Sequence, residues 1–290
     1  MILEKTFHQG ETNKPLLIFI HGMGMNARAW SDPAEARILG GRYPLTVLLR
    51  SDDEMKTSFA DLKRSGFPVL SWTQSRPAGP IRIAVNELKG LTEEYHNRAK
   101  NGTVLVGHSR GGLIARKYLE DCAESVCGLV TLATPHRGTT IAGWAVSLSP
   151  ITSALNQIVQ GVSKKKVDST FRRVLSFLCS SGLRELLPGS KFFLNLHDRK
   201  HQGMRCISVG GTNPDLLNAI SVSLTELVSK MVPDRIIPEE MTEGYGDGLV
   251  SAVSSVLPYG DEHRNFPVNH AAVLFNKEVR NFVIKSVESF

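Results

Sequence analysis

The segment Gly107-His108-Ser109-Arg110-Gly111-Gly112 is the strongest indication of fold and function in this chain. It follows the apolar stretch 103–106, which predicts a buried strand, and it precedes residues 113–119, whose apolar spacing predicts a helix. A G-x-S-x-G motif between a strand and a helix forms a turn so sharp that only glycine fits on either side of the serine. We therefore expect Ser109 to project its hydroxyl above the carboxyl edge of a sheet, at a helix N-terminus that favours negative charge.

Apolar runs of strand length occur throughout the chain and alternate with helical periodicity. We expect strands at 16–20, 45–49, 67–72, 103–106, 128–133, 205–209 and 264–268, and helices at 54–64, after Pro80, after Ser109 and at the C-terminus. A continuously apolar strand is buried on both of its faces, which is typical of a parallel sheet between layers of helices. The predicted class is α/β.

One long segment without charged residues, 138–163, interrupts this alternation. Only about half of it is apolar and it contains Pro150, so an amphipathic helix or helix pair fits better than a transmembrane segment. We interpret 137–200 as a helical cap, or lid, over a core made of 1–136 and 201–290, with a possible second cap helix at 213–232. Within the cap, the apolar stripe offers three candidate acyl-binding side chains: Trp144, Leu148 and Leu155.

Composition excludes several classes of function. The 34 basic residues are scattered among 28 acidic ones, giving a net charge of +6, and this pattern argues against nucleic-acid binding. The four cysteines form no CxxC pair, so no zinc site is predicted. Because residues 1–14 are polar and resemble no signal peptide, we expect a cytoplasmic protein, or a secreted one if a leader has been removed.

A serine nucleophile needs two backbone donors for the oxyanion. One is the N–H of Arg110, the residue after the serine. The other should come from the loop after the strand 16–20, where glycines flank Met23, so the Met23 amide is the candidate. His21 in the same loop precedes the nucleophile, whereas the base of this arrangement comes last in the chain. We expect His21 to order the loop.

The base must be a histidine beyond Ser109, and the candidates are His136, His197, His201, His263 and His270. His270 lies between the last predicted strand and the last helix, which is the expected position. Asp215 and Asp247 compete for the acid, with Asp261 a distant third. Asp215 directly follows a strand but falls in a predicted first helical turn, where it would serve the helix dipole. Asp247 lies in a glycine-rich turn that can hold a carboxylate rigidly, and we favour it.

These residues resemble the α/β-hydrolase superfamily and, within it, the bacterial triacylglycerol lipases. Five segments carry the resemblance, in family order: His21-Gly22-Met23, Gly107 to Gly112, Thr134-Pro135-His136-Arg137-Gly138, Asp247-Gly248-Leu249-Val250 and Asn269-His270. The resemblance implies a mostly parallel sheet flanked by helices with a lid, and Ser109, Asp247 and His270 as the catalytic triad. It also implies a calcium ion near the base. Here Ala271 and Ala272 follow His270, so we expect no metal.

The leading hypothesis is a serine-dependent carboxylic-ester hydrolase, a lipase or esterase, that needs no cofactor and acts on a small-molecule acyl ester or a lipid. A thioesterase or an acyltransferase would use the same triad. A non-catalytic binding protein on this scaffold is a third reading. The uncharged stripe allows transient contact with a lipid interface, and a permanently packed cap helix explains it equally well.

Overall fold

The computed structural model describes residues 3–38, 43–44, 55–147, 181–215 and 237–290. Its centre is a sheet in which every pairing is parallel except the one at the β1 edge. In spatial order the strands are β1 (Lys5–His8), β5 (Val69–Trp72), β2 (Leu16–Ile20), β6 (Thr103–His108), β7 (Val126–Leu132), β8 (Arg205–Gly211) and β9 (Glu262–Phe266). A separate short ladder pairs β3 (Arg37–Ile38) with β4 (Tyr43–Pro44).

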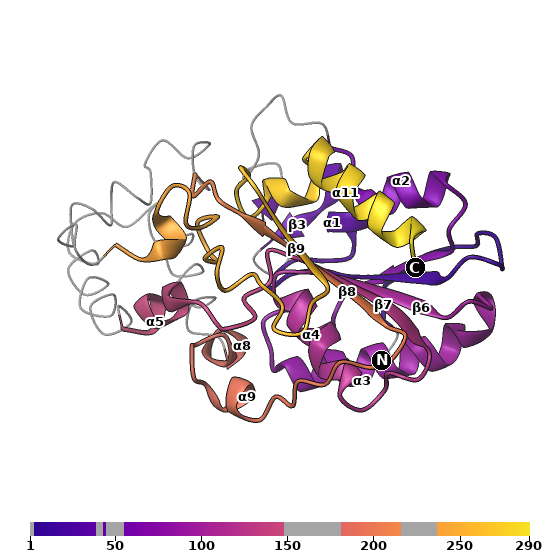
Figure 1. Ribbon diagram of the computed structural model, residues 1–290, viewed down its shortest axis with the longest axis horizontal. Coiled ribbons are helices and arrows are strands. Elements are labelled where there is room, and N and C mark those ends of the chain that lie inside the picture. Colours follow the sequence, from indigo (N-terminus) through magenta and orange to yellow (C-terminus); the bar gives the residue numbers. More distant parts are fainter. Residues whose placement is uncertain (1–2, 39–42, 45–54, 148–180, 216–236) are drawn as a thin grey trace, which may run out of the picture.

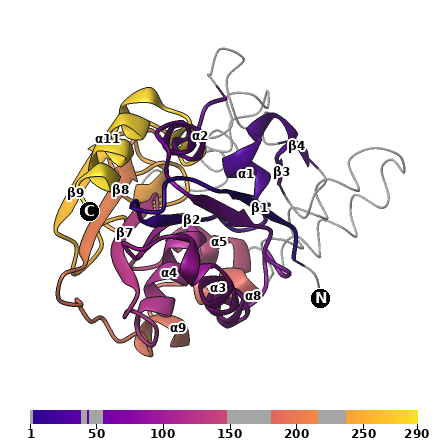
Figure 2. The same ribbon diagram turned by 90° about the vertical axis from the view of Figure 1, so that its right-hand side faces the viewer.

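Helices cover both faces of this sheet (Figures 1 and 2). One face is covered by α1 (Arg28–Ser31), α2 (Ser58–Arg64) and α11 (Lys277–Glu288). The opposite face is covered by α3 (Ile81–Tyr95), α4 (Arg110–Leu119) and α8 (Ser181–Glu185). The remaining helices are α5 (Thr140–Ser147) and α9 (Lys191–Leu194), with 3₁₀ turns at Pro33–Glu35, His96–Arg98, Glu239–Met241 and Ala272–Leu274. The expected α/β-hydrolase fold class is thereby confirmed.

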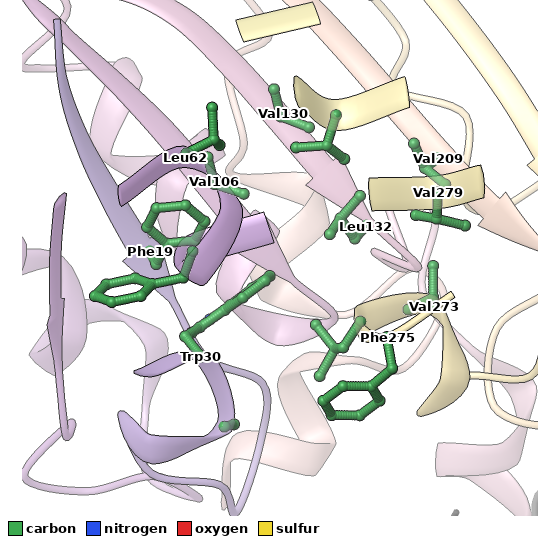
Figure 3. Close-up of a cluster of buried hydrophobic side chains, with 14 of the residues drawn as sticks. Phe19, Trp30, Leu62, Val106, Val130, Leu132, Val209, Val273, Phe275 and Val279 are labelled. Atoms are coloured by element: carbon green, nitrogen blue, oxygen red, sulfur yellow. The ribbon is translucent and has the colours of Figure 1, made fainter. Parts of the chain in front are cut away.

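The central strands are apolar throughout because each of their faces meets a different helical layer. In β2, Leu17 and Phe19 belong to the buried cluster beneath α1 and α2, and Figure 3 shows Phe19 beside Trp30 and Leu62. The alternate residues of the same strand, including Ile18, belong to the cluster beneath α3 and α4. Full burial of one such side chain stabilises the fold by roughly 1.5–3 kcal/mol.

The structure contains most of the strands expected from the sequence, with informative differences at the edges. The last strand is β9 at Glu262–Phe266 rather than 264–268, and β1 was not expected at all. Both are edge strands with largely exposed or half-buried side chains, so neither carries a continuous apolar run. The helix expected from residue 54 begins at Ser58, where the Thr57 hydroxyl accepts a hydrogen bond from the Ala60 amide at 3.3 Å. The strand expected at 45–49 lies outside the described residues.

The two described ends of the predicted cap lie against each other. The Thr139 amide donates to the Leu186 carbonyl at 2.8 Å, and a Cβ added at Gly138 would lie 2.7 Å from the Pro188 nitrogen. The greater part of the apolar stripe and the possible second cap helix lie outside the described residues, so the cap at 137–200 stays a prediction. Among the helices that are described, none is long and apolar enough to span a membrane.

Candidate active site

Ser109 occupies a strained turn between β6 and α4. Its backbone has φ 53° and ψ −126°, in the left-handed half of conformational space that residues with a Cβ rarely adopt. The turn is fixed because the Ser109 amide donates to the Leu132 carbonyl at 2.8 Å and the Gly112 amide donates to the Ser109 carbonyl at 3.0 Å. Ser109 thus stands at the carboxyl end of the sheet, as the motif predicts, and is 9% exposed.

The glycines of the motif are required by close backbone approach. A Cβ at Gly107 would lie 2.5 Å from the Gly112 Cα, and one at Gly111 would lie 2.3 Å from the Ile20 carbonyl oxygen. A Cβ at Gly112 would lie 2.1 Å from the Thr134 hydroxyl. The elbow therefore packs directly against β2 and against the segment after β7.

Asp247 and His270 meet in a buried hydrogen bond. Nδ1 of His270 lies 2.9 Å from Oδ2 of Asp247, and the two residues are 6% and 0% exposed. The other carboxylate oxygen accepts from the amides of Leu249 and Val250 at 3.0 and 2.7 Å. The backbones are joined as well, because the His270 amide donates to the Asp247 carbonyl at 2.9 Å. The carboxylate is held from both sides and oriented toward one imidazole nitrogen.

His108 brings this pair to the nucleophile. Its Nε2 donates to the His270 carbonyl at 3.0 Å, and the two rings lie 5.0 Å apart between centroids. Because His108 directly precedes Ser109, this contact joins the loop that carries the candidate base to the strand that ends at the candidate nucleophile. In the part of the chain that the structure describes, no hydrogen bond involves the Ser109 hydroxyl, and such bonds often tighten only when substrate is bound.

The loop after β2 also lies close to the serine. A Cβ at Gly22 would lie 3.2 Å from the Ser109 Cβ and 2.9 Å from Nδ1 of His108. The next amides along the loop are engaged, since Gly24 donates to the Pro77 carbonyl at 3.0 Å and Met25 donates to the Gly22 carbonyl at 3.4 Å. Met23, the predicted oxyanion donor, therefore lies in a tight turn next to Ser109.

The competing acids are placed elsewhere. Asp215 is exposed, and its own amide donates to the Asn213 side chain at 2.9 Å. Its carbonyl accepts from Asn269, so its backbone lies near the base although its carboxylate has no contact with His270 within the described residues. Asp261 pairs with Lys200 and with the Cys206 amide, at the opposite end of β8, and these contacts lower its pKa.

Three of the competing histidines have structural partners or face solvent, and the fourth, His201, precedes β8 and so lies at the end of the sheet opposite to Ser109. His136 contacts the Thr131 hydroxyl at 3.0 Å, which is the hydrogen-bonding role expected of it. His263 lies in β9 between the side chains of Ser208 and Asn265. The side chain of His197 is 87% exposed. Burial lowers the pKa of His21 to about 4 and that of His108 to about 3, so both rings stay neutral at ordinary pH.

The structure says little about the three predicted acyl-binding residues. Leu148 and Leu155 lie outside the described residues, and Trp144 is described only by its backbone position in α5. Their role stays a prediction. Within the described ranges, no group of three or more histidine, cysteine or acidic side chains could hold a metal ion.

Two buried polar side chains beside the site had no signal in the sequence. Gln74 is 2% exposed, follows β5 and contacts both His21 and Arg110. Glu240 is 3% exposed, and its carboxylate accepts hydrogen bonds from Thr139 and Thr140 at the start of α5. A single glutamine or glutamate in a loop is usually exposed, and only the packing of distant segments reveals that these two are not.

Known proteins resemble this chain in sequence and in fold. The family model for palmitoyl protein thioesterase matches residues 17–173, which is more than half of the chain. A pimeloyl-[acyl-carrier protein] methyl ester esterase of Sodalis glossinidius is 25% identical over 249 residues, covering 85% of this chain and 80% of the relative.

The solved structures similar to this chain include lipases and esterases. The mature form of the Bacillus licheniformis lipase BlEst2 has a TM-score of 0.55 at 15% identity, over 98% of this chain and 97% of that one. Its propeptide form has a TM-score of 0.60 at 14% identity, over 97% of this chain but only 53% of the longer one, so this chain spans about half of that form. The metagenomic carboxyl esterase MGS0156 has a TM-score of 0.57 at 14% identity, over 97% of this chain and 77% of that one.

The class follows from the fold and these relatives. A mostly parallel sheet between helices, with an elbow serine after β6, is the architecture of the α/β-hydrolases, and the relatives make this chain an esterase-type member of that class. Within the class, the chain belongs to the palmitoyl protein thioesterase family.

Proposed function

We propose that this protein is a serine-dependent acyl hydrolase in which Ser109, His270 and Asp247 act as nucleophile, base and acid. The observation that carries the proposal is the buried 2.9 Å hydrogen bond between Asp247 and His270, next to a serine in an elbow turn. Nucleophile, acid and base occur in the chain order of this fold. A scaffold retained only for binding would not need to orient an imidazole with a buried carboxylate.

The geometry supports a two-step reaction. With Nδ1 of His270 bound to Asp247, Nε2 is free to take the proton from the Ser109 hydroxyl as its oxygen attacks the acyl carbonyl carbon. Asp247 then stabilises the imidazolium. The imidazolium returns its proton to the leaving alcohol or thiol, and an acyl-enzyme ester on Ser109 remains. Water repeats the sequence in reverse, releasing the carboxylic acid.

The developing negative charge needs donors that are already in place. The amides of Met23 and Arg110 are our candidates, one from the loop beside Ser109 and one from the first turn of α4. Because a tetrahedral intermediate carries more charge on its oxygen than the substrate does, these donors stabilise the transition state more than the ground state.

The leaving group separates two candidate functions. The curated relative is an ester hydrolase, which favours a carboxylic ester as substrate. The family model takes its description from a protein thioesterase, which favours a thioester. Both substrates give the same acyl-enzyme, so the triad serves either. We further propose that the substrate is a small-molecule acyl ester or a lipid. Contact between a lid and a lipid interface is also part of this proposal.

A fluorophosphonate probe and a matched substrate pair test these functions. The probe should label the wild-type protein and not Ser109→Ala, and absence of wild-type labelling would refute the proposed nucleophile. An octanoyl nitrophenyl ester and the matching octanoyl nitrophenyl thioester should then be compared at concentrations well below KM, where the rate reports formation of the acyl-enzyme. The same acyl-enzyme forms from both, so a higher kcat/KM for the thioester assigns the protein to thioester hydrolysis, and the opposite result assigns it to esters.

A further inference from the structure

Gln74 connects the two segments that carry the candidate oxyanion donors. Its side-chain Nε2 donates to the His21 carbonyl at 2.9 Å, and its Oε1 accepts from Nη1 of Arg110 at 2.5 Å. Its backbone amide donates to Nε2 of the His21 ring at 3.1 Å. Met23 follows His21 by two residues, and the amide of Arg110 is the other candidate donor. The Gln74 side chain therefore joins the two segments that supply the candidate oxyanion donors.

The orientation of the Gln74 amide is determined by chemistry. A guanidinium has only donors, so the group that faces Arg110 must be the oxygen. The nitrogen then faces the His21 carbonyl, which only accepts. Reversing the amide would place two donors together and two acceptors together in a buried site.

The neighbours of Gln74 are equally constrained. Because Nε2 of His21 accepts from the Gln74 amide, its proton is on Nδ1, which donates to the Gly22 carbonyl at 2.8 Å. The Arg110 guanidinium also donates to the Gly79 carbonyl at 2.6 Å. His21, Gln74 and Arg110 are 1%, 2% and 0% exposed, so water does not compete for these hydrogen bonds.

We propose that Gln74 is the positioning residue of the oxyanion hole, holding the Met23 loop and the first turn of α4 at a fixed separation. The inference rests on the proposed function, since it assumes that the two amides stabilise an oxyanion. Gln74 itself touches no substrate. Its effect is that both donors are in place before charge develops, which is the condition under which such donors accelerate a reaction.

Two variants separate the two bonds. In Gln74→Glu, the carboxylate still accepts from Arg110, but no proton remains for the His21 carbonyl. In Gln74→Met, a side chain of similar length loses both bonds. The matched control is Tyr118→Phe. Tyr118 lies at the C-terminal end of α4, far from Arg110, and the substitution removes its buried hydrogen bond of 2.9 Å to Thr92 in α3.

The readout is the affinity for two inhibitors of the same chain length. A trifluoromethyl ketone forms a tetrahedral adduct with Ser109 and places an oxyanion in the hole, whereas the methyl ketone binds as a ground-state analogue. We expect both Gln74 variants to lower kcat about 10-fold or more with little change in KM, because loss of one whole donor typically costs 10²–10³-fold. Affinity for the trifluoromethyl ketone should fall by the same factor, with the methyl ketone changing less than about two-fold.

The outcomes are distinguishable. Equal weakening of both ketones, or unchanged kcat in a folded Gln74→Glu, would overturn the positioning role. If Gln74→Met does not fold, Gln74→Glu decides alone, because its link to Arg110 is retained. The Tyr118→Phe control should lose stability without changing the ratio of the two ketone affinities. Failure of the proposed function would be seen separately, as a wild-type protein that neither ketone inhibits and that the fluorophosphonate probe does not label.

Discussion

The two sides of the candidate site are held by different forces. On the nucleophile side, the elbow touches the backbone at the end of β2 and the Thr134 side chain after β7, at distances that leave no room for a Cβ. On the acid–base side, the turn with Asp247 and the loop with His270 are held by hydrogen bonds to one carboxylate. Steric contact tolerates no added atom, whereas a hydrogen-bond network loses its members one at a time. The two sides should therefore respond differently to substitution.

The largest effect is expected from Gly107→Ala on the nucleophile side. The new Cβ would lie 2.5 Å from backbone atoms of Gly112, so the elbow has to move and Ser109 with it. We expect activity to fall on the order of 10⁶-fold, as when a catalytic serine is removed, with a lower unfolding temperature. The control is Gly90→Ala in α3, where the added Cβ meets no atom within 4 Å and should stabilise the helix by roughly 0.5–1 kcal/mol. Near-normal activity in Gly107→Ala would contradict the steric account.

Asp247→Asn should disrupt the acid–base side of the site without changing the position of its backbone. An asparagine can still accept from the Leu249 and Val250 amides, but it presents an N–H to His270 and so favours the wrong tautomer. We expect kcat to fall on the order of 10⁴-fold, by analogy with the serine proteases, with a small change in unfolding temperature. The exposed Asp215→Asn should keep most of its activity. An inactive Asp215→Asn beside an active Asp247→Asn would reverse our assignment of the acid.

Acid should destabilise the protein through its buried histidines. The pKa of His21 is lowered to about 4 and that of His108 to about 3 in the folded state, against about 6.5 when exposed, so unfolding takes up protons below pH 6.5. Stability is complete above pH 6.5 and is lost as the pH falls toward 4, on the order of 3 kcal/mol for His21 alone.

Urea unfolding midpoints measured between pH 7 and pH 4 check this expectation. His108→Gln provides the comparison, because a glutamine amide can still donate to the His270 carbonyl but does not titrate in this range. Its unfolding free energy should depend less steeply on pH than that of the wild type. Identical slopes in the two proteins would rule out His108 as a source of the pH dependence.

Glu240→Gln should give the smallest effect, since it changes a supporting bond on the acid–base side. Glu240 accepts from the Thr140 amide and hydroxyl at 2.7 and 2.8 Å, and its own carbonyl accepts from the Gly248 amide, next to Asp247, at 2.7 Å. In the glutamine variant the hydroxyl can reverse and accept. We expect a loss of about 1 kcal/mol in unfolding free energy and less than a ten-fold loss in kcat.

Glu240→Ala completes the comparison. It leaves the Thr140 amide and hydroxyl unpaired and should cost about 1–3 kcal/mol, measured by urea unfolding. If Glu240→Gln lost as much activity as Asp247→Asn, the charge of Glu240 would act in catalysis, and its role would not be only to support the Asp247 turn.

The sheet and the nucleophile elbow could be predicted from the sequence. Continuous apolar runs and closely spaced glycines reflect local requirements, because each buried strand meets helices on both faces and each elbow glycine lies too close to its neighbours for a Cβ. These constraints are visible within a few residues of one another. The edge strands β1 and β9 were missed or misplaced for the same reason, since exposed side chains impose no such pattern.

The contacts between distant polar groups could not be predicted in this way and are seen only in the folded chain. The local sequence favoured Asp247 over Asp215, but it did not show that Asp215 is exposed or that two amides and an imidazole hold the Asp247 carboxylate. The burial and the partners of Gln74 and Glu240 could not be predicted from the sequence for the same reason. A hydrogen bond needs its partner within about 3 Å, and partners 36 and 100 residues apart are brought together only by the packing of the sheet and its helices.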